Sequence, residues 1–160
     1  MEAFSSAGFT KADFTRMTEE SKLMFRKGSQ HLLKLCQGCD IRFLIVSGGI
    51  SELIQHSLRM LERHNLDQGE QSHDFTSVGI LSNEFEYSND SASTVSGYRE
   101  PLIHSGNKQE VIYDHSGVDL RKNVIVMGDI VEDSQMVRDA NHETVLRVGF
   151  LNRQVQEESD

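Results

Sequence analysis

The sequence has no long apolar run, no surplus of basic residues and no secretory start. No apolar stretch approaches the roughly 20 residues that a membrane-spanning helix needs. Lys and Arg number 16 against 25 Asp and Glu, a formal net charge of -9, and this balance disfavours nucleic acid and anionic membranes as partners. The first residues lack the basic and apolar blocks of a signal peptide, so we expect a cytoplasmic protein.

A second pair of cysteines is also missing. Cys36 and Cys39 form an isolated C-x-x-C pair, and no closely spaced pair of His residues offers two more ligands for zinc. A redox pair or half of a metal site is therefore one interpretation, and two ordinary structural thiols are the other. The second is favoured, because Gly38 is placed to end a helix just before Cys39.

The size and composition are those of one soluble globular domain. A chain of 160 residues can bury a sizeable core, and 37% hydrophobic with 26% charged residues is ordinary for such a domain. Acidity does not exclude small phosphate ligands, because one Lys, backbone N–H groups and a metal ion suffice to bind them.

Apolar periodicity and turn residues predict strands that alternate with helices. Strands are expected over residues 41–49, 76–83, 123–127 and 144–152, and helices over 18–36 with a break at Gly28, over 50–64, after Asn107 as the cap, and after Asp133. Residues 88–94 are rich in turn formers and predict a hairpin tip. This alternation is typical of an α/β fold with a parallel sheet, in which ligands bind at the carboxyl ends of the strands.

Polar residues stand where two of these strands end or a helix begins. Ser47 and Gly48 follow an apolar strand and could donate O–H and N–H groups to an anion at a helix start. A plain strand-to-helix turn is the alternative. Lys108 opens another predicted helix and could neutralise a phosphate, although a lysine in such a place is more often a solvated surface charge.

Two carboxylates follow the apolar strand NVIVM. Asp129 ends the strand and Asp133 lies four residues later, at the predicted helix start. Neighbouring carboxylates repel one another unless a cation lies between them, and Mg²⁺ is the natural candidate for hard oxygen ligands. The alternative is an acidic first turn that merely complements the helix dipole.

The order of hydroxyl, then lysine, then aspartate pair resembles that of the haloacid-dehalogenase-like phosphatases. Within that superfamily, five blocks resemble, in order, the cytosolic 5'-nucleotidase type III (pyrimidine 5'-nucleotidase) family: FLIVSGGISELIQHSLR, VGILSNEFEYS, EPLIHSGNK, NVIVMGDIVEDSQM and LRVGFLN. The resemblance implies a Rossmann-like, haloacid-dehalogenase-type parallel sheet with flanking helices, in a monomer. It also implies Mg²⁺-dependent hydrolysis of nucleoside 5'-monophosphates, expected to be pyrimidine ones, to nucleoside and phosphate.

The resemblance assigns a role to each of these residues. Ser47 matches the serine that binds the substrate phosphate, with the Gly48 backbone beside it. Lys108 matches the lysine that stabilises the phosphoryl group and the charge of the nucleophile. Asp129 matches the aspartate that ligates Mg²⁺, and Asp133 matches the second acidic residue of that motif, which holds the metal through its waters.

The sequence departs from the family at its first motif, a strand that ends in Asp-x-Asp and supplies the nucleophile and the general acid. Asp13 is a poor substitute, because no apolar strand precedes it and Thr15 stands where the second Asp is needed. Smaller departures affect the fine geometry of the site: Gly48-Gly49 in place of Ala-Gly, Ile130 in place of a small polar residue, and Glu132 in place of Gly.

We therefore expect the first strand and most of the helical cap to be missing. Residues 1–30 would be a remnant of the cap and the return to the core, and residues 31–160 an incomplete core domain. In the family, the missing strand lies between the strands of Ser47 and Asp129, which would otherwise have unpaired edges or pair with each other. The chain alone is then expected to be poorly stable and nearly inactive. The alternative function is a non-catalytic fragment that binds phosphate, Mg²⁺ or a partner.

Overall fold

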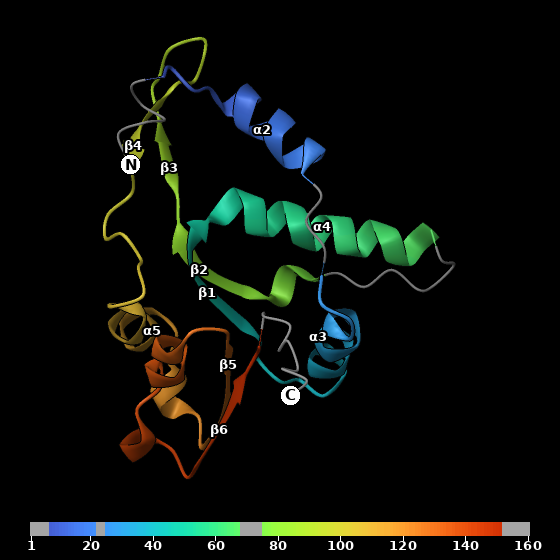
Figure 1. Ribbon diagram of the computed structural model, residues 1–160, viewed down its shortest axis with the longest axis vertical. Helices are drawn as coiled ribbons and strands as arrows, with labels where there is room; N and C mark the ends of the chain where they lie inside the picture. The colour runs from blue at the N-terminus through green and yellow to red at the C-terminus, as the bar shows by residue number, and fades with distance from the viewer. Residues whose placement is uncertain (1–6, 22–24, 68–74, 152–160) are drawn as a thin grey trace, which may run out of the picture. The chain divides into compact units, whose positions relative to one another are not determined.

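The computed structural model describes residues 7–21, 25–67 and 75–151, and the chain divides into two compact units, Met1–Leu102 and Ile103–Asp160 (Figure 1). Each unit contains a parallel pair of strands together with helices, so the predicted α/β class is confirmed. The predicted domain boundary between residues 30 and 31 falls inside a helix of the first unit, and it stays a prediction.

The first unit is built around two parallel strands. Its elements are α2 (Lys11–Glu20), α3 (Ser29–Gly38), β1 (Leu44–Ile50), α4 (Ser51–Asp67), η1 (Phe75–Ser77), β2 (Gly79–Asn83), β3 (Phe85–Tyr87) and β4 (Val95–Tyr98). β1 pairs with β2, and α4 runs beside this pair (Figure 1). Burial of apolar side chains from α3, α4 and η1 stabilises the arrangement, and these are Leu33, Leu58, Leu61 and Phe75.

The hairpin of β3 and β4 forms a second apolar cluster with α2. Phe14 of α2 packs edge-on against Phe85 of β3, with ring centroids 5.3 Å apart, and Val95 of β4 is buried beside them. The tip between the two strands covers the turn-rich residues 88–94, so the predicted hairpin is confirmed. The predicted break at Gly28 is also confirmed, because this glycine precedes α3 with a φ of 92°, which an L side chain rarely adopts. The helix predicted on the other side of this break is wrong, because α2 ends at Glu20 and residues 25–28 are not helical.

Asp13 is part of the cap of α2. The Thr10 side chain accepts from the Asp13 N–H, and the Asp13 carboxylate accepts from the N–H and the hydroxyl of Thr10 at 3.1 and 2.7 Å. Arg16 adds an ion pair at 2.8 Å. This reciprocal capping box gives Asp13 a structural role at the start of a helix.

Removing the Thr10 hydroxyl should change the titration of Asp13. Its hydrogen bonds with Thr10, followed by the Arg16 charge, hold the pKa of the Asp13 carboxyl below its ordinary 3.8. Because the folded pKa is depressed, the stability that Asp13 contributes is present above the ordinary value and is lost as pH falls through the folded value. We expect Thr10→Ala to raise this pKa, as measured by a carboxyl ¹³C NMR titration. Thr15→Ala is the matched control, since the Thr15 hydroxyl donates to the Lys11 carbonyl instead. Equal midpoints for the two variants would contradict the prediction.

The second unit contains the other parallel pair. Its elements are α5 (Lys108–His115), η2 (Val118–Leu120), β5 (Asn123–Gly128), η3 (Val131–Gln135), η4 (Asp139–Asn141) and β6 (Thr144–Gly149). β5 and β6 stay in register over their whole length, from Asn123 opposite Thr144 to Gly128 opposite Gly149. The buried apolar side chains of this unit come from α5, β5 and the loops beside them, and they are Ile103, Val111, Ile112, Val126, Met136 and Val137.

The described residues form three separate two-stranded sheets. In this part of the chain β1 therefore has one neighbouring strand, β2, and β5 has one, β6.

Two further local predictions were wrong. No α-helix follows Asp133 in the described chain; residues 131–135 and 139–141 form short 3-10 turns, because carbonyls of this segment accept from side chains of other elements rather than from N–H groups four residues ahead. Asn107 precedes α5 but does not cap it through its side chain. Its Oδ1 instead accepts from the His104 N–H at 2.8 Å, and its φ of -121° and ψ of 4° lie outside the extended region that N-caps favour.

None of the helices in the described ranges combines the length and the apolar character that a membrane crossing requires.

Candidate functional site

A buried ion pair lies at the carboxyl end of β5. Lys108 begins α5 and Asp133 lies in the middle of η3, and their Nζ and Oδ1 atoms are 2.6 Å apart. Their side chains are only 12% and 8% exposed. Charges removed from water this far need a partner, and here each supplies the other. Lys108 is therefore not a solvated surface charge, which was the alternative interpretation of the sequence.

The second carboxylate oxygen of Asp133 faces the end of the strand. Its Oδ2 accepts from the Asp129 N–H at 3.3 Å, so one carboxylate bonds to both α5 and β5. The close approach depends on Gly128, because a Cβ there would overlap the Cβ, Cγ and Oδ2 atoms of Asp133. Glycine at the last position of β5 thus leaves room for the buried carboxylate.

Asp129 is exposed where Asp133 is buried. The structure thus brings together three of the predicted residues, Lys108, Asp129 and Asp133, and it gives the two carboxylates different environments. Asp129 is exposed to solvent, and both oxygens of the buried Asp133 accept hydrogen bonds within the unit.

This donor set fits a magnesium ion that keeps several waters. Mg²⁺ is commonly held by one or two carboxylates and completes its octahedron with water and phosphate oxygens. Within the described ranges no cluster of three or more His, Cys, Asp or Glu side chains is placed to hold a metal. The roles expected for the two aspartates, direct contact of Asp129 with the ion and contact of Asp133 through water, stay predictions.

Ser47 and Gly48 belong to the first unit and lie in an irregular part of β1. The register with β2 shifts between Val46 and Ile50, so the Ser-Gly-Gly stretch bulges out of the ladder just before α4 begins at Ser51. The Ser47 Oγ accepts from the Gly49 N–H at 3.0 Å and keeps its own hydrogen to donate. The Gly48 carbonyl accepts from the buried Asn83 side chain at 2.9 Å, which fixes the bulge against the end of β2.

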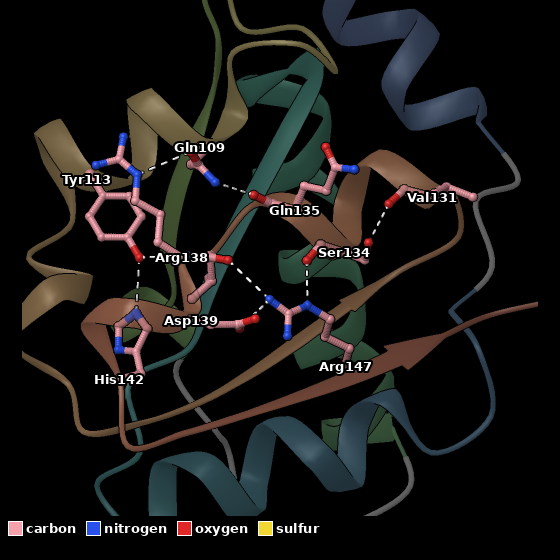
Figure 2. A network of polar contacts seen from close by, with 10 residues as sticks. Gln109, Tyr113, Val131, Ser134, Gln135, Arg138, Asp139, His142 and Arg147 are labelled. Atoms are coloured by element: carbon pink, nitrogen blue, oxygen red, sulfur yellow. Dashed lines mark hydrogen bonds and ion pairs between the residues drawn. The ribbon is translucent and has the colours of Figure 1, made fainter.

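Three side-chain bonds from outside η3 fix the carbonyls that follow Asp133 (Figure 2). Gln109 of α5 donates its Nε2 to the Gln135 carbonyl at 2.6 Å. Arg147 of β6 donates its Nε to the Ser134 carbonyl at 2.6 Å and an Nη2 hydrogen to the Val137 carbonyl at 3.2 Å. The sequence interpretation missed both residues. For Arg147 there was a signal, since a charged residue inside the apolar strand TVLRVGF needs a polar partner.

A second set of contacts joins α5 to the segment after η3. The Arg138 N–H donates to the Tyr113 hydroxyl at 2.8 Å, and this hydroxyl lies 3.1 Å from the His142 Nε2 (Figure 2). The His142 Nδ1 is 2.6 Å from the Arg121 carbonyl, and a carbonyl can only accept, so Nδ1 carries the proton. These contacts tie η4 and its flanks to α5, and no sequence signal predicted them.

Cys36 and Cys39 are not joined by a disulfide, and Cys36 is buried whereas Cys39 is exposed. Burial, followed by the neighbouring Cys39, raises the pKa of the Cys36 thiol. A raised pKa works against the thiolate that metal binding or redox chemistry requires. The assignment of both residues as structural thiols stays a prediction.

A family model matches nearly the whole chain. The model described as pyrimidine 5'-nucleotidase (UMPH-1) covers residues 2–160.

Curated relatives match over almost the whole chain but only half of their own length. The 7-methylguanosine phosphate-specific 5'-nucleotidase of Gallus gallus is 24% identical over 162 residues, covering 98% of this chain and 52% of the relative. The Homo sapiens protein of the same name is 25% identical over 152 residues, with 92% and 47% covered. The chain thus spans about half the length of these relatives.

A solved structure shares the fold. The crystal structure of cytosolic 5'-nucleotidase IIIB bound to cytidine aligns with a TM-score of 0.67 at 22% identity. The alignment covers 94% of this chain and 51% of the solved chain.

Proposed function

Because the chain belongs to the pyrimidine 5'-nucleotidase (UMPH-1) family, we propose that it carries the Mg²⁺- and phosphate-binding part of a phosphohydrolase that converts nucleoside 5'-monophosphates to nucleoside and phosphate. The observation that carries the proposal is the buried Lys108–Asp133 pair beside the exposed Asp129, at the end of a parallel strand. A structural ion pair alone would not require a second, solvent-facing carboxylate at this position.

Three residues of the second unit, Asp129, Asp133 and Lys108, have separate proposed roles. Asp129 offers its carboxylate to the metal, while Asp133 holds the Asp129 N–H and the Lys108 ammonium in place. Lys108 has three N–H donors, and those not donated to Asp133 are available to phosphoryl oxygens. Mg²⁺, when bound, would offset the negative charge of the phosphate.

Ser47 and Gly48, in the first unit, are proposed as a phosphate-binding element. The bulge presents a hydroxyl that can donate, and α4 begins directly after it, so its first N–H groups and its dipole favour an anion nearby. The fixed Gly48 carbonyl supports this role, because it holds the backbone of the bulge in one position.

The proposal for the base of the substrate rests on the names of the family and of the relatives. The family name specifies pyrimidine nucleotides, and the solved relative is bound to cytidine, so CMP and UMP are the first substrates to test. The curated relatives are named for 7-methylguanosine phosphate, which makes that nucleotide the third member of the panel. A cytoplasmic location is proposed as well, since the solved relative is called cytosolic.

The test is Mg²⁺ binding and phosphate release by wild type and Asp129→Asn. We expect the substitution to weaken Mg²⁺ binding by more than about 10-fold in calorimetry, since even partners outside the direct ligand shell contribute 10–100-fold. Any phosphate release from the nucleotide panel should fall at least as much. Asp119→Asn is the matched control, because it removes the same charge from an exposed position of the same unit. Equal Mg²⁺ affinity in the two variants would overturn the assignment of Asp129.

The second candidate is a protein that binds phosphate and Mg²⁺ without catalysis. It is favoured by the lack of an Asp-x-Asp motif in the sequence, since covalent catalysis needs a nucleophile. Mg²⁺ and phosphate binding without release of phosphate from any nucleotide would support this candidate. Release that depends on Asp129 would exclude it.

A further inference from the structure

The loop that carries Asp133 is the short 3-10 helix η3. At its two ends the Asp133 N–H donates to the Ile130 carbonyl at 3.1 Å and the Met136 N–H donates to the Asp133 carbonyl at 3.2 Å, and within it the Ser134 hydroxyl donates to the Val131 carbonyl at 2.6 Å. Such 3-10 turns have poorer hydrogen-bond geometry than an α-helix. The Ser134 carbonyl, which belongs to the peptide between Ser134 and Gln135, is held by a bond from outside η3.

Arg147 makes that bond. Its Nε donates to the Ser134 carbonyl, and Nη2 reaches both the Val137 carbonyl and the Asp139 carboxylate, the latter at 2.7 Å (Figure 2). One planar group thus fixes positions at both ends of the segment from 134 to 139. Since β6 is paired in register with β5, Arg147 also ties this segment to the strand that ends at Gly128.

We propose that Arg147 is a positioning residue, which orients the Asp133 carboxylate for Mg²⁺ and phosphate binding; this inference rests on the proposed function. Arg147 does not contact Asp133 itself but fixes the residue after it. Lys108 and the Asp129 N–H hold the carboxylate from the other side. Without the guanidinium, the backbone at Ser134 can rotate and move the carboxylate away from both.

The proposal distinguishes arginine from lysine. The Nε and Nη2 atoms of a guanidinium are fixed relative to each other and reach two carbonyls at once, whereas an ammonium is a point charge. Lysine at this position can keep the ion pair with Asp139, whose side chain is 74% exposed, but it cannot reproduce both carbonyl bonds. If only the charge mattered, lysine would be equivalent.

The experiment compares Arg147→Lys with wild type in three measurements. These are the Asp133 carboxyl ¹³C chemical shift at neutral pH, the Mg²⁺ dissociation constant, and the midpoint of urea unfolding. We expect a changed shift and a dissociation constant raised about 10-fold, as for other residues outside the direct ligand shell, with the unfolding midpoint nearly unchanged. Arg121→Lys, at an exposed arginine of the same unit, should change none of the three.

Each outcome decides between specific alternatives. The positioning role is overturned if Arg147→Lys leaves both the ¹³C chemical shift of the Asp133 carboxyl and the Mg²⁺ affinity unchanged. Loss of the folded backbone spectrum overturns it too, in favour of a purely structural role. If the wild-type protein itself binds no Mg²⁺, the proposed function fails. The ¹³C chemical shift of the Asp133 carboxyl then decides the positioning role alone.

Discussion

Replacement of Asp133 by alanine is expected to destabilise the second unit by about 3 kcal/mol, because it leaves a buried ammonium without its partner. Lys108 is only 12% exposed, so water cannot easily replace the lost carboxylate. The Asp129 N–H loses its acceptor as well. The measurement is hydrogen exchange of the β5 and β6 amides as a function of urea, which reports the stability of this unit separately.

A surface ion pair of the same unit supplies the comparison. Lys122 and Glu143 lie 2.8 Å apart, but their side chains are 76% and 65% exposed. Exposed pairs contribute about 0–1 kcal/mol, so Glu143→Ala should cost far less than Asp133→Ala. The double variant Lys108→Met with Asp133→Leu should recover much of the loss, since apolar residues of similar volume can replace a buried pair. Equal losses for the two alanine variants would refute the account of the buried pair.

Gly128→Ala is expected to destabilise the second unit by about 2 kcal/mol, the typical cost of overpacking, and to displace Asp133 from its two donors. The added methyl group would occupy the space of the Asp133 side chain. Neither partner can move cheaply, because Asp133 is fixed by Lys108 and Gly128 by the strand ladder. Urea unfolding measures the loss, and the Asp133 carboxyl shift measures the displacement.

The control for this change lies directly opposite in the sheet. Gly149 pairs in register with Gly128, and a Cβ at Gly149 meets nothing within 4 Å. Alanine in a strand costs less conformational entropy than glycine, so Gly149→Ala should be neutral or slightly stabilising. If both variants lose the same stability, the effect comes from the strand and not from crowding at Asp133.

The sequence predicted the strands and their polar ends because both depend on short-range pattern. Neighbouring residues alone are enough to recognise the apolar run of β5 and the Gly-Asp that follows it. The same holds for the turn-rich tip between β3 and β4. The identity of Lys108 as a site candidate needed the family order of motifs. Its burial against Asp133, 25 residues away, is a property of the folded unit.

Two of the failures come from competing hydrogen bonds, a local one at Asn107 and long-range ones after Asp133. Asn107 is a good N-cap former, yet its side chain bonds to His104 in the preceding loop. The segment after Asp133 does not continue as an α-helix, because Gln109 and Arg147 bind its carbonyls. Neither competitor is close in sequence to the carbonyl it binds, so no local pattern could reveal the outcome.

The dependence of η3 on side chains from α5 and β6 affects how relatives of this protein should be recognised. A motif search that reads only positions 129 and 133 would accept chains that keep both aspartates but have lost the amide at 109 and the guanidinium at 147. Such chains would share the signature without the geometry that these donors give the loop. Positions 109, 128 and 147 therefore belong in the signature, although no ligand is expected to touch them.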